Sequence, residues 1–280
     1  MAIEVVTTRV GLRERVAGWR AAGETIALVP TMGFLHDGHM SLVDIVKAKA
    51  DRVVASLFVN PTQFSPSEDL ATYPRDQEGD LAKFEAHGVD AVYIPDVSQM
   101  YPSGFATSVA VSGFGEGLCA ETRPIFFQGV ATVVSKLLIQ CWPDYAIFGE
   151  KDYQQLCVIR RMALDLDIPT QILAGPTVRE ADGLAMSSRN AYLTPEERRI
   201  APILNRELLK AAVNPTRPAI AAAGTAILDA GFRSIDYVEL RDAETLQSVT
   251  TPLTRPARLL AAAWLGKARL IDNVAVAPVT

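Results

Sequence analysis

The sequence predicts an α/β protein: a Rossmann-like, doubly wound parallel sheet followed by a smaller C-terminal α+β domain. Strand-like and helix-like patterns alternate from residue 26 to about residue 177, which is typical of a parallel sheet. Polar motifs follow several of the predicted strands, and open α/β sheets bind ligands at those strand ends. From residue 178 onward helices come first and strand-like runs follow. We therefore predict one domain over residues 1–177 and a second over residues 178–280.

The first predicted unit is a strand, a turn with two glycines and a helix. An apolar run at 26–29 leads into the turn at 30–39, and the segment 40–50 follows with apolar residues at 42, 45, 46 and 50 on one helix face. We expect this helix to start near His39. A β-branched run at 52–60 comes next, so the three elements predict a βαβ unit with parallel strands.

The alternation continues through the rest of the first domain. Residues 76–87 predict a helix that Gly88 ends, and residues 90–95 predict a strand. The Gly-, Ser- and Pro-rich stretch 96–128 predicts a loop region with one short strand at 108–111. A helix at 129–141, a strand at 145–148, a helix at 153–166 and a strand at 170–178 complete the pattern.

The C-terminal region has a different order of elements. Thr194, Pro195 and Glu197 form a capping box with proline at the first helical position, and Pro202 should kink the helix that follows. A second helix is predicted at 219–230, and strands at 235–240, 258–265 and 268–273. The two residues 266–267, glycine first, predict a hairpin between the last two strands.

Composition excludes several classes of function. The net charge of −5 comes without a basic block, which argues against a nucleic-acid partner. No uncharged apolar run is long enough to span a bilayer, and the N-terminus lacks the pattern of a signal peptide. The three cysteines show no metal-binding or disulfide spacing. We therefore expect a cytoplasmic protein with small-molecule partners, no membrane partner and no metal site made by protein residues alone.

Candidate ligand residues cluster in four polar stretches. His36 and His39 share a turn with Gly33 and Gly38 at a predicted helix start, where backbone N–H groups favour a negatively charged ligand. The other stretches are 60–64, 149–155 and 186–190, which supply amides, hydroxyls and cations. Together these groups predict a nucleotide phosphate site, because phosphoryl transfer requires cations and preorganised donors around the developing charge.

The His-x-Gly-His turn with a distal lysine and a Ser-Ser-Arg loop resembles the nucleotidyl-transferase superfamily. Within it, the chain resembles the pantoate–β-alanine ligase (pantothenate synthetase) family over essentially its whole length. The motifs that carry this resemblance are PTMG at 30–33, HDGH at 36–39, FVNPTQF at 58–64, YPRD at 73–76, FGEKDYQQ at 148–155 and MSSRN at 186–190.

The resemblance implies ATP-dependent ligation of pantoate and β-alanine through a pantoyl adenylate, with release of pyrophosphate and AMP. It implies that His39 is the catalytic histidine, that Gln63 and Gln155 bind pantoate, and that Gln63 also binds β-alanine. It further implies Mg²⁺ on the ATP phosphates, a C-terminal domain that covers the site, and a homodimer. The implied ATP-binding residues are Met32, Gly33, Phe34, Leu35, His36, Asp37, Gly38, His39, Gly149, Glu150, Lys151, Asp152, Val178, Met186, Ser187, Ser188 and Arg189.

One short segment departs from the family pattern. After Arg123-Pro124 the family often has Gly-His-Phe, whereas this chain has Ile125-Phe126-Phe127. Phe126 cannot donate or accept a hydrogen bond, so a polar role of the family histidine has no counterpart here. Two alternatives to the ligase are an adenylyl transferase acting on a phosphorylated acceptor and a nucleotide-binding protein without turnover. The two glutamines and the shortage of further basic residues near the site argue against the first.

Overall fold

The computed structural model describes residues 3–64 and 70–278, and the chain forms two compact units. The N-terminal unit consists of residues 1–115, 123–150 and 155–176, and the C-terminal unit consists of residues 116–122, 151–154 and 177–280. Two short segments from before residue 177 thus group with the C-terminal unit. The boundary at 177/178 and the covering role of the second domain stay predictions.

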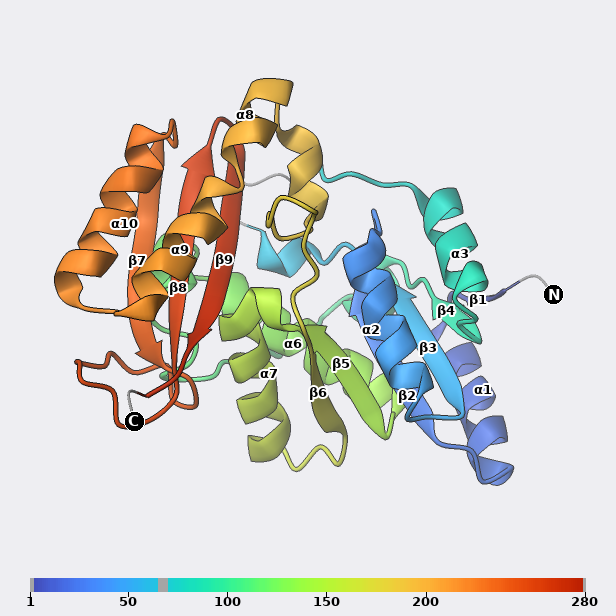
Figure 1. Ribbon diagram of the computed structural model, residues 1–280. Helices are drawn as coiled ribbons and strands as arrows, with labels where there is room; N and C mark the ends of the chain where they lie inside the picture. The colour runs from blue at the N-terminus through green and yellow to red at the C-terminus, as the bar shows by residue number, and fades with distance from the viewer. Residues whose placement is uncertain (1–2, 65–69, 279–280) are drawn as a thin grey trace. The chain divides into compact units, whose positions relative to one another are not determined.

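The N-terminal unit contains a six-stranded, all-parallel sheet, as the sequence predicts (Figure 1). The strand order is β1-β4-β3-β2-β5-β6. The strands are β1 (Glu4–Val6), β2 (Ile26–Thr31), β3 (Arg52–Leu57), β4 (Ala91–Tyr93), β5 (Tyr145–Gly149) and β6 (Gln171–Gly175).

Helices cover both faces of this sheet. The main helices are α1 (Arg9–Ala21), α2 (Asp37–Lys47), α3 (Gln77–Ala86), α6 (Phe126–Cys141) and α7 (Tyr153–Asp165), with a short α4 (Val97–Met100). Ala27 and Val29 of β2 pack with α2 and with Phe84 of α3 in one buried cluster. Successive strand residues point to opposite faces. Ile26 and Leu28, both fully buried, therefore face the other side of the sheet, where α6 contacts β2.

Strand β2 lies at the point where the chain changes direction across the sheet. Its neighbours are β3, which follows it directly, and β5, which comes over a hundred residues later. Thr31 at the end of β2 lies opposite Leu57 at the end of β3. Loops after such strands diverge and leave a crevice, which is the usual ligand position in this architecture. The two-glycine turn follows β2 at this point.

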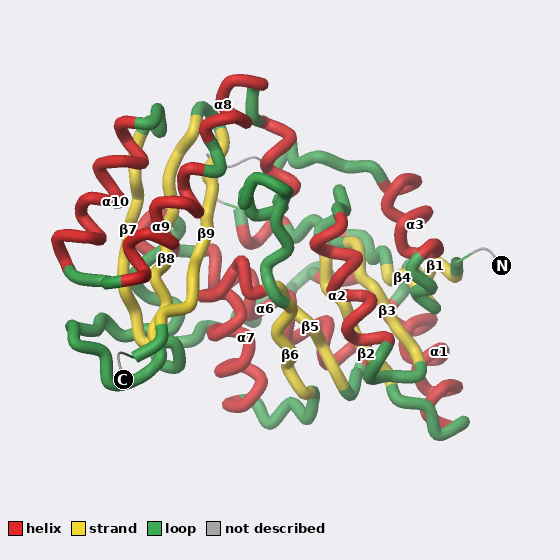
Figure 2. Tube along the Cα trace, viewed as in Figure 1, coloured by secondary structure: helices red, strands yellow, loops and turns green. Residues whose placement is uncertain are grey.

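The C-terminal unit is built on a three-stranded antiparallel sheet of β7 (Ser234–Asp242), β8 (Ala257–Leu265) and β9 (Ala268–Val276). Leu265 pairs with Ala268, which confirms the predicted two-residue turn. Helices α9 (Ile203–Val213) and α10 (Arg217–Asp229) pack on one face and share a buried cluster with alternate residues of the strands (Figure 2). The shorter α8 (Pro195–Ile200) begins with the predicted capping box.

The other face of this sheet is contacted by the two short segments 116–122 and 151–154. Cys119, in the short α5 (Cys119–Thr122), has its Sγ atom 3.0 Å from the hydroxyl of Tyr237 on β7. Gln154 links the two segments, because its Oε1 accepts the Cys119 N–H and its Nε2 donates to the carbonyls of Glu116 and Gly117. The sequence gives no sign of this arrangement.

Several local predictions differ from the structure. Residues 108–111 form no strand, because the Val109 N–H donates to the hydroxyl of Thr132 on α6 and pairs with no neighbouring strand. Pro202 divides the predicted kinked helix into α8 and α9. Helix α2 begins at Asp37, with His36 at its N-cap, two residues before the predicted start. Strand β1 and helix α1 were not predicted.

Candidate active site

The turn after β2 has a backbone that a buried carboxylate holds in place. Gly33 has φ +89° and Phe34 has φ +52°, so two successive residues adopt the left-handed region. Asp80, in the first turn of α3 and 2 % exposed, accepts the N–H groups of Phe34 and Leu35 at 2.8 and 2.7 Å. Its carboxylate offsets part of the strain by satisfying two donors at once.

His36 and His39 lie together at the start of α2. Their ring centroids are 4.1 Å apart, and Nδ1 of His39 accepts the backbone N–H of His36 at 3.3 Å. A nitrogen that accepts a hydrogen bond carries no proton, so the proton of neutral His39 resides on Nε2. Helix α2 thus begins with exposed backbone donors and an imidazole whose N–H donor is Nε2.

Gln63 follows β3 in the short helical turn η1 (Pro61–Gln63) and is 6 % exposed. Its Oε1 accepts from Asn60 Nδ2 at 3.2 Å, and its Nε2 lies 2.9 Å from the sulfur of Met32. Tyr101 donates its hydroxyl proton to Asn60 Oδ1 at 2.7 Å. Burial raises the pKa of the Tyr101 phenol, although its hydrogen bonds with Thr62 and Asn60 oppose that shift. The network therefore fixes the orientation of the Gln63 amide.

Helix α6 supports the Gln63 turn through a very close backbone contact. A Cβ at Gly129 would overlap the carbonyl oxygen of Thr62 and would lie 2.8 Å from Cα of Gln63. Only glycine permits that approach, since both obstacles are backbone atoms. Gly129 also accepts a hydrogen bond from Asn60 Nδ2 at its carbonyl, at 3.2 Å.

The unusual Phe126 has a packing role in the structure. The guanidinium of Arg123 lies over its ring, 3.6 Å from the centroid, and Arg123 Nη2 donates to the carbonyl of Gln63 at 3.4 Å. Phe126 is 8 % exposed and meets Phe127 edge-on. An aromatic ring at this position thus orients a cation beside Gln63 through a cation–π contact.

Three more of the candidate residues belong to the N-terminal unit. Gly149 is the last residue of β5, Glu150 follows it, and Gln155 lies in the first turn of α7, half-buried. A Cβ at Gly149 would meet no atom within 4 Å, so the space beside this strand end is open. Since β5 pairs with β2 in parallel, Gly149 and the His36 turn follow the same edge of the sheet.

The remaining candidate residues belong to the C-terminal unit. A short antiparallel loop brings Val178 and Met186 together, because the Met186 N–H donates to the Val178 carbonyl at 3.0 Å and Arg179 pairs with Ala185. Ser187 caps the helical turn η3 (Ser188–Tyr192), with its hydroxyl accepting the Arg189 N–H at 3.3 Å. The Ser-Ser-Arg motif therefore adopts one defined conformation.

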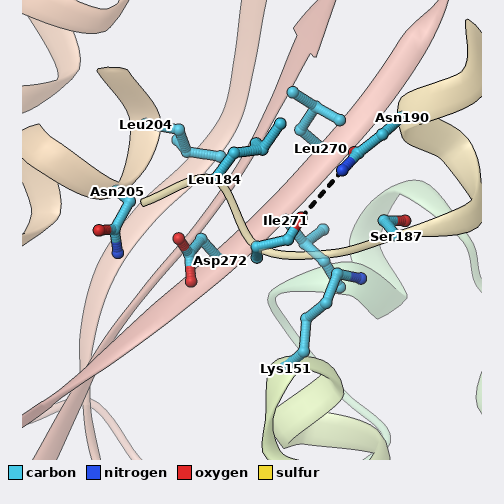
Figure 3. A pocket seen from close by; sticks show the side chains of 10 residues that line it. Lys151, Leu184, Ser187, Asn190, Leu204, Asn205, Leu270, Ile271 and Asp272 are labelled. Atoms are coloured by element: carbon cyan, nitrogen blue, oxygen red, sulfur yellow. Dashed lines mark hydrogen bonds between the residues drawn. The ribbon is translucent and has the colours of Figure 1, made fainter. Parts of the chain in front are cut away.

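Lys151 and Ser187 both line a small pocket in the C-terminal unit (Figure 3). Asn190 lies beside Ser187 and donates from Nδ2 to the carbonyl of Ala185 at 3.1 Å. The Lys151 side chain is 18 % exposed, and its ammonium lies 3.6 Å from the Asp152 carboxylate. The pocket is lined by Lys151, Leu184, Ala185, Ser187, Asn190, Leu204, Asn205, Leu270, Ile271 and Asp272.

The predicted residues thus form two groups, one in each unit. The residues 32–39, Gln63, Gly149, Glu150 and Gln155 belong to the N-terminal unit, and the residues 151–152, 178 and 186–189 to the C-terminal unit. Within the residues described, no group of three or more His, Cys, Asp or Glu side chains is arranged to hold a metal ion.

Sequence reasoning missed the residues that hold these groups in place. Asp80 and Gly129 are the clearest examples. An acidic residue inside a helix and a glycine inside an apolar helix are the only signals that the sequence carries for them.

A parallel sheet with two histidines and two glycines in the turn at its direction change defines the class: an α/β protein with a strand-end site suited to an anionic ligand. The family is equally clear. Residues 4–275 match the family model described as Pantoate-beta-alanine ligase, and the chain belongs to that family.

Individual relatives agree with this assignment over nearly the full chain. A protein named pantothenate synthetase from Paramagnetospirillum magneticum is 57 % identical, covering 99 % of both chains. The crystal structure of pantothenate synthetase from Thermus thermophilus matches with a TM-score of 0.89 at 45 % identity, over 99 % of this chain and 100 % of that one. The Francisella tularensis pantoate-beta-alanine ligase, crystallised with β-γ ATP and β-alanine, matches with a TM-score of 0.83 at 31 % identity, over 98 % and 97 %.

The predicted family and fold class are therefore confirmed. The chain is an enzyme, a ligase that joins pantoate and β-alanine in an ATP-dependent reaction of pantothenate biosynthesis. None of the helices in residues 3–64 and 70–278 is long and apolar enough to cross a membrane.

Proposed function

We propose that the ligation proceeds through a pantoyl adenylate, with His39 as the catalytic residue of the first step. The pantoate carboxylate attacks the α-phosphorus of ATP, and the bond to pyrophosphate breaks. The β-alanine amine then attacks the acyl carbon of the adenylate, forms the amide after loss of a proton, and expels AMP. A free carboxylate is a poor electrophile, so activation by adenylation makes the second step feasible.

The single observation that carries the assignment of His39 is the hydrogen bond at its Nδ1. That bond leaves Nε2–H as the donor, and we propose that it donates to an oxygen of the reacting phosphate. Negative charge on that oxygen grows in the transition state, so a fixed donor stabilises the transition state more than the ground state. His36 positions ATP in this proposal, together with the backbone of residues 32–35 and the start of α2.

The amide of Gln63 is proposed to bind pantoate with Gln155 and to contact β-alanine. Its orientation is set by Asn60 and by the sulfur of Met32, which supports a role in placing the nucleophilic carboxylate. Orientation of this kind contributes to catalysis because it replaces a random encounter by a fixed geometry.

We propose that Lys151, Ser187, Ser188 and Arg189 bind the phosphate groups of ATP, with Gly149, Glu150, Asp152, Val178 and Met186 as further parts of the ATP site. Lys151 and Ser187 line one pocket, which supports a joint role. Mg²⁺ enters with ATP in this proposal. Phosphate and carboxylate oxygens are the ligands it prefers, and the ion would neutralise charge on the leaving pyrophosphate.

The assay that tests this proposal follows AMP and pyrophosphate with ATP, Mg²⁺, pantoate and β-alanine. Pyrophosphate exchange into ATP should require pantoate but not β-alanine, because only the first step is reversible without the amine. AMP release should require both. Pyrophosphate exchange without pantoate would contradict the adenylate route. AMP release at the full rate without β-alanine would contradict it as well.

We further propose a cytoplasmic homodimer in which the C-terminal domain covers the site. All three cysteines are buried and none of them forms a disulfide, which agrees with a reducing compartment. Light scattering on the purified chain should give twice the mass of 30.3 kDa, and a monomeric mass at working concentrations would reject the dimer.

A further inference from the structure

Lys151 is attached to the C-terminal unit by its backbone. The segment 151–154 groups with that unit although both flanking residues group with the other. The Lys151 carbonyl accepts a hydrogen bond from Nδ2 of Asn273 at 3.0 Å. Two residues further on, the Tyr153 hydroxyl donates to the carbonyl of Ala243 at 2.7 Å. The lysine thus sits on a short stretch that the antiparallel sheet holds.

Asn273 contacts the Lys151 segment both directly and through Arg258. Arg258 Nη1 donates to Asn273 Oδ1 at 2.7 Å, and the Arg258 guanidinium lies 4.2 Å from the centre of the Tyr153 ring. Tyr153 is two residues from Lys151, so Arg258 also contacts the segment that carries the lysine. The guanidinium only donates and the Lys151 carbonyl only accepts, so the amide of Asn273 has one orientation that satisfies both.

Packing of the sheet alone does not explain an asparagine at this position. Asn273 is 3 % exposed, lies within β9 and is paired with Leu260 of β8. Asparagine is disfavoured in strands, and burying its amide costs free energy unless hydrogen bonds compensate. Its neighbour Asp272 points to the opposite face and pairs with Arg179 at 2.7 and 2.9 Å, so the two polar residues serve different partners.

We propose that Asn273, supported by Arg258, is a positioning residue that sets the place of Lys151 in the ATP-phosphate site. The inference rests on the proposed role of Lys151. A lysine is a point charge on a flexible stem, so its reach to a phosphate depends on where its backbone is held. Loss of the Asn273 hydrogen bond lets the segment shift, and a shift of about 1 Å in a charged group weakens its interaction with the transition state.

The test compares Asn273→Asp with the unaltered enzyme in steady-state kinetics. Aspartate keeps the size and the acceptor for Arg258 but presents an oxygen to the Lys151 carbonyl. We expect KM for ATP to rise roughly 3- to 10-fold, the scale of one hydrogen bond. KM for pantoate should change less than about twofold, because Gln63 is held in the other unit by Asn60 and Met32. An unchanged KM for ATP overturns the inference.

A double-mutant cycle separates positioning from general structural damage. If Asn273 acts through Lys151, then Asn273→Asp adds no further loss of ATP affinity when made in Lys151→Ala. Additive losses overturn the inference. Trp264→Phe is the matched control, since it removes a hydrogen bond to Asp236 from the same sheet and should leave KM for ATP unchanged.

A second variant keeps the inference testable if Asn273→Asp folds poorly. Arg258→Lys retains the charge but loses the planar group that pairs with Asn273 and stacks on Tyr153, so it should raise KM for ATP in the same direction. An Arg258→Lys enzyme with unaltered KM for ATP counts against the inference. Failure of the proposed role of Lys151 is distinct: Lys151→Ala alone would then leave KM for ATP unchanged.

Discussion

The two sheets of this protein place polar residues in different ways. In the parallel sheet they follow the ends of β2, β3 and β5, where the sequence shows them as compact motifs. In the antiparallel sheet the important polar residues, Asp272 and Asn273, lie inside β9 and are 4 % and 3 % exposed. The first arrangement places side chains at the sheet edge where this architecture usually binds a ligand, and the second uses buried side chains to hold other segments.

The difference shows that the candidate site has two kinds of parts. Residues at strand ends, such as His39 and Lys151, carry the proposed chemistry. Buried residues fix the backbone beside them: Asp80 holds the histidine turn, and Asn273 holds the Lys151 carbonyl. If this division is right, substitutions at strand ends should change rate constants far more than stability. Substitutions of the buried supports should change both.

The largest effect is expected at His39. His39→Ala should slow pyrophosphate exchange roughly 10²- to 10⁴-fold, the usual scale for a positioned acid–base group. Thermal unfolding should change little, because the ring is half-buried in a turn that Asp80 holds. His87→Ala is the matched control, since His87 caps α3 and pairs with Asp44 at 2.9 Å. Near-normal exchange by the His39 variant would remove this residue from its role.

Gly129→Ala should damage both the rate and the stability. The added methyl group meets backbone atoms of Thr62 and Gln63, so α6 and the Gln63 turn must separate. We expect a loss of about 1–3 kcal/mol in the free energy of unfolding, typical of overpacking, and a higher KM for pantoate. Chemical denaturation and initial-rate assays measure the two effects.

Gly18→Ala provides the control for that substitution. A Cβ at Gly18 of α1 meets no atom within 4 Å, so alanine there should be neutral or slightly stabilising. A Gly129→Ala protein as stable as this control, with an unchanged KM for pantoate, would contradict the support that we assign to α6.

Asp80→Asn should weaken the turn that carries the histidines. The amide retains one acceptor oxygen for the two N–H groups of Phe34 and Leu35, so we expect a loss of about 1.5–3 kcal/mol in unfolding free energy. The affinity for ATP, measured by calorimetry, should fall together with the unfolding free energy. Asp51→Asn, at an exposed carboxylate that accepts from Thr25, should cost less. Equal losses for the two variants would argue against a special role of Asp80.

The smallest expected effect depends on pH and belongs to the antiparallel sheet. Burial alone would raise the pKa of Asp242, but hydrogen bonds from Thr245 and Glu244 outweigh it and lower the pKa below its ordinary value of 3.8. The carboxylate therefore stabilises the folded state above about pH 4, and this contribution is lost as the pH falls through the lower folded value.

Asp242→Asn tests whether the ionised carboxylate stabilises the folded state. The variant should be less stable than the unaltered chain at pH 7 by about 1–2 kcal/mol, and the difference should shrink toward pH 3. Urea denaturation at both pH values measures it. A difference that grows as the pH falls would show that the carboxylate is not the stabilising form.

Regular periodicity made most of the fold predictable. The alternation of strands and helices, the capping box at Thr194 and the hairpin at Gly266 are local signals, and each appears where the sequence places it. Prediction failed where a distant side chain takes the place of a local partner. Residues 108–111 have the composition of a strand, yet the Val109 N–H is satisfied by Thr132, more than twenty residues away.

The sequence by itself determined the family, the parallel sheet and the identity of the turn residues, because these depend on motifs and periods within short stretches of chain. The tertiary structure alone decided what holds those residues. Asp80 accepts two N–H groups from a turn 45 residues earlier, and Asn273 donates to a carbonyl 122 residues earlier. Hydrogen bonds of that range leave no local pattern, since they form only when folding brings the two segments together.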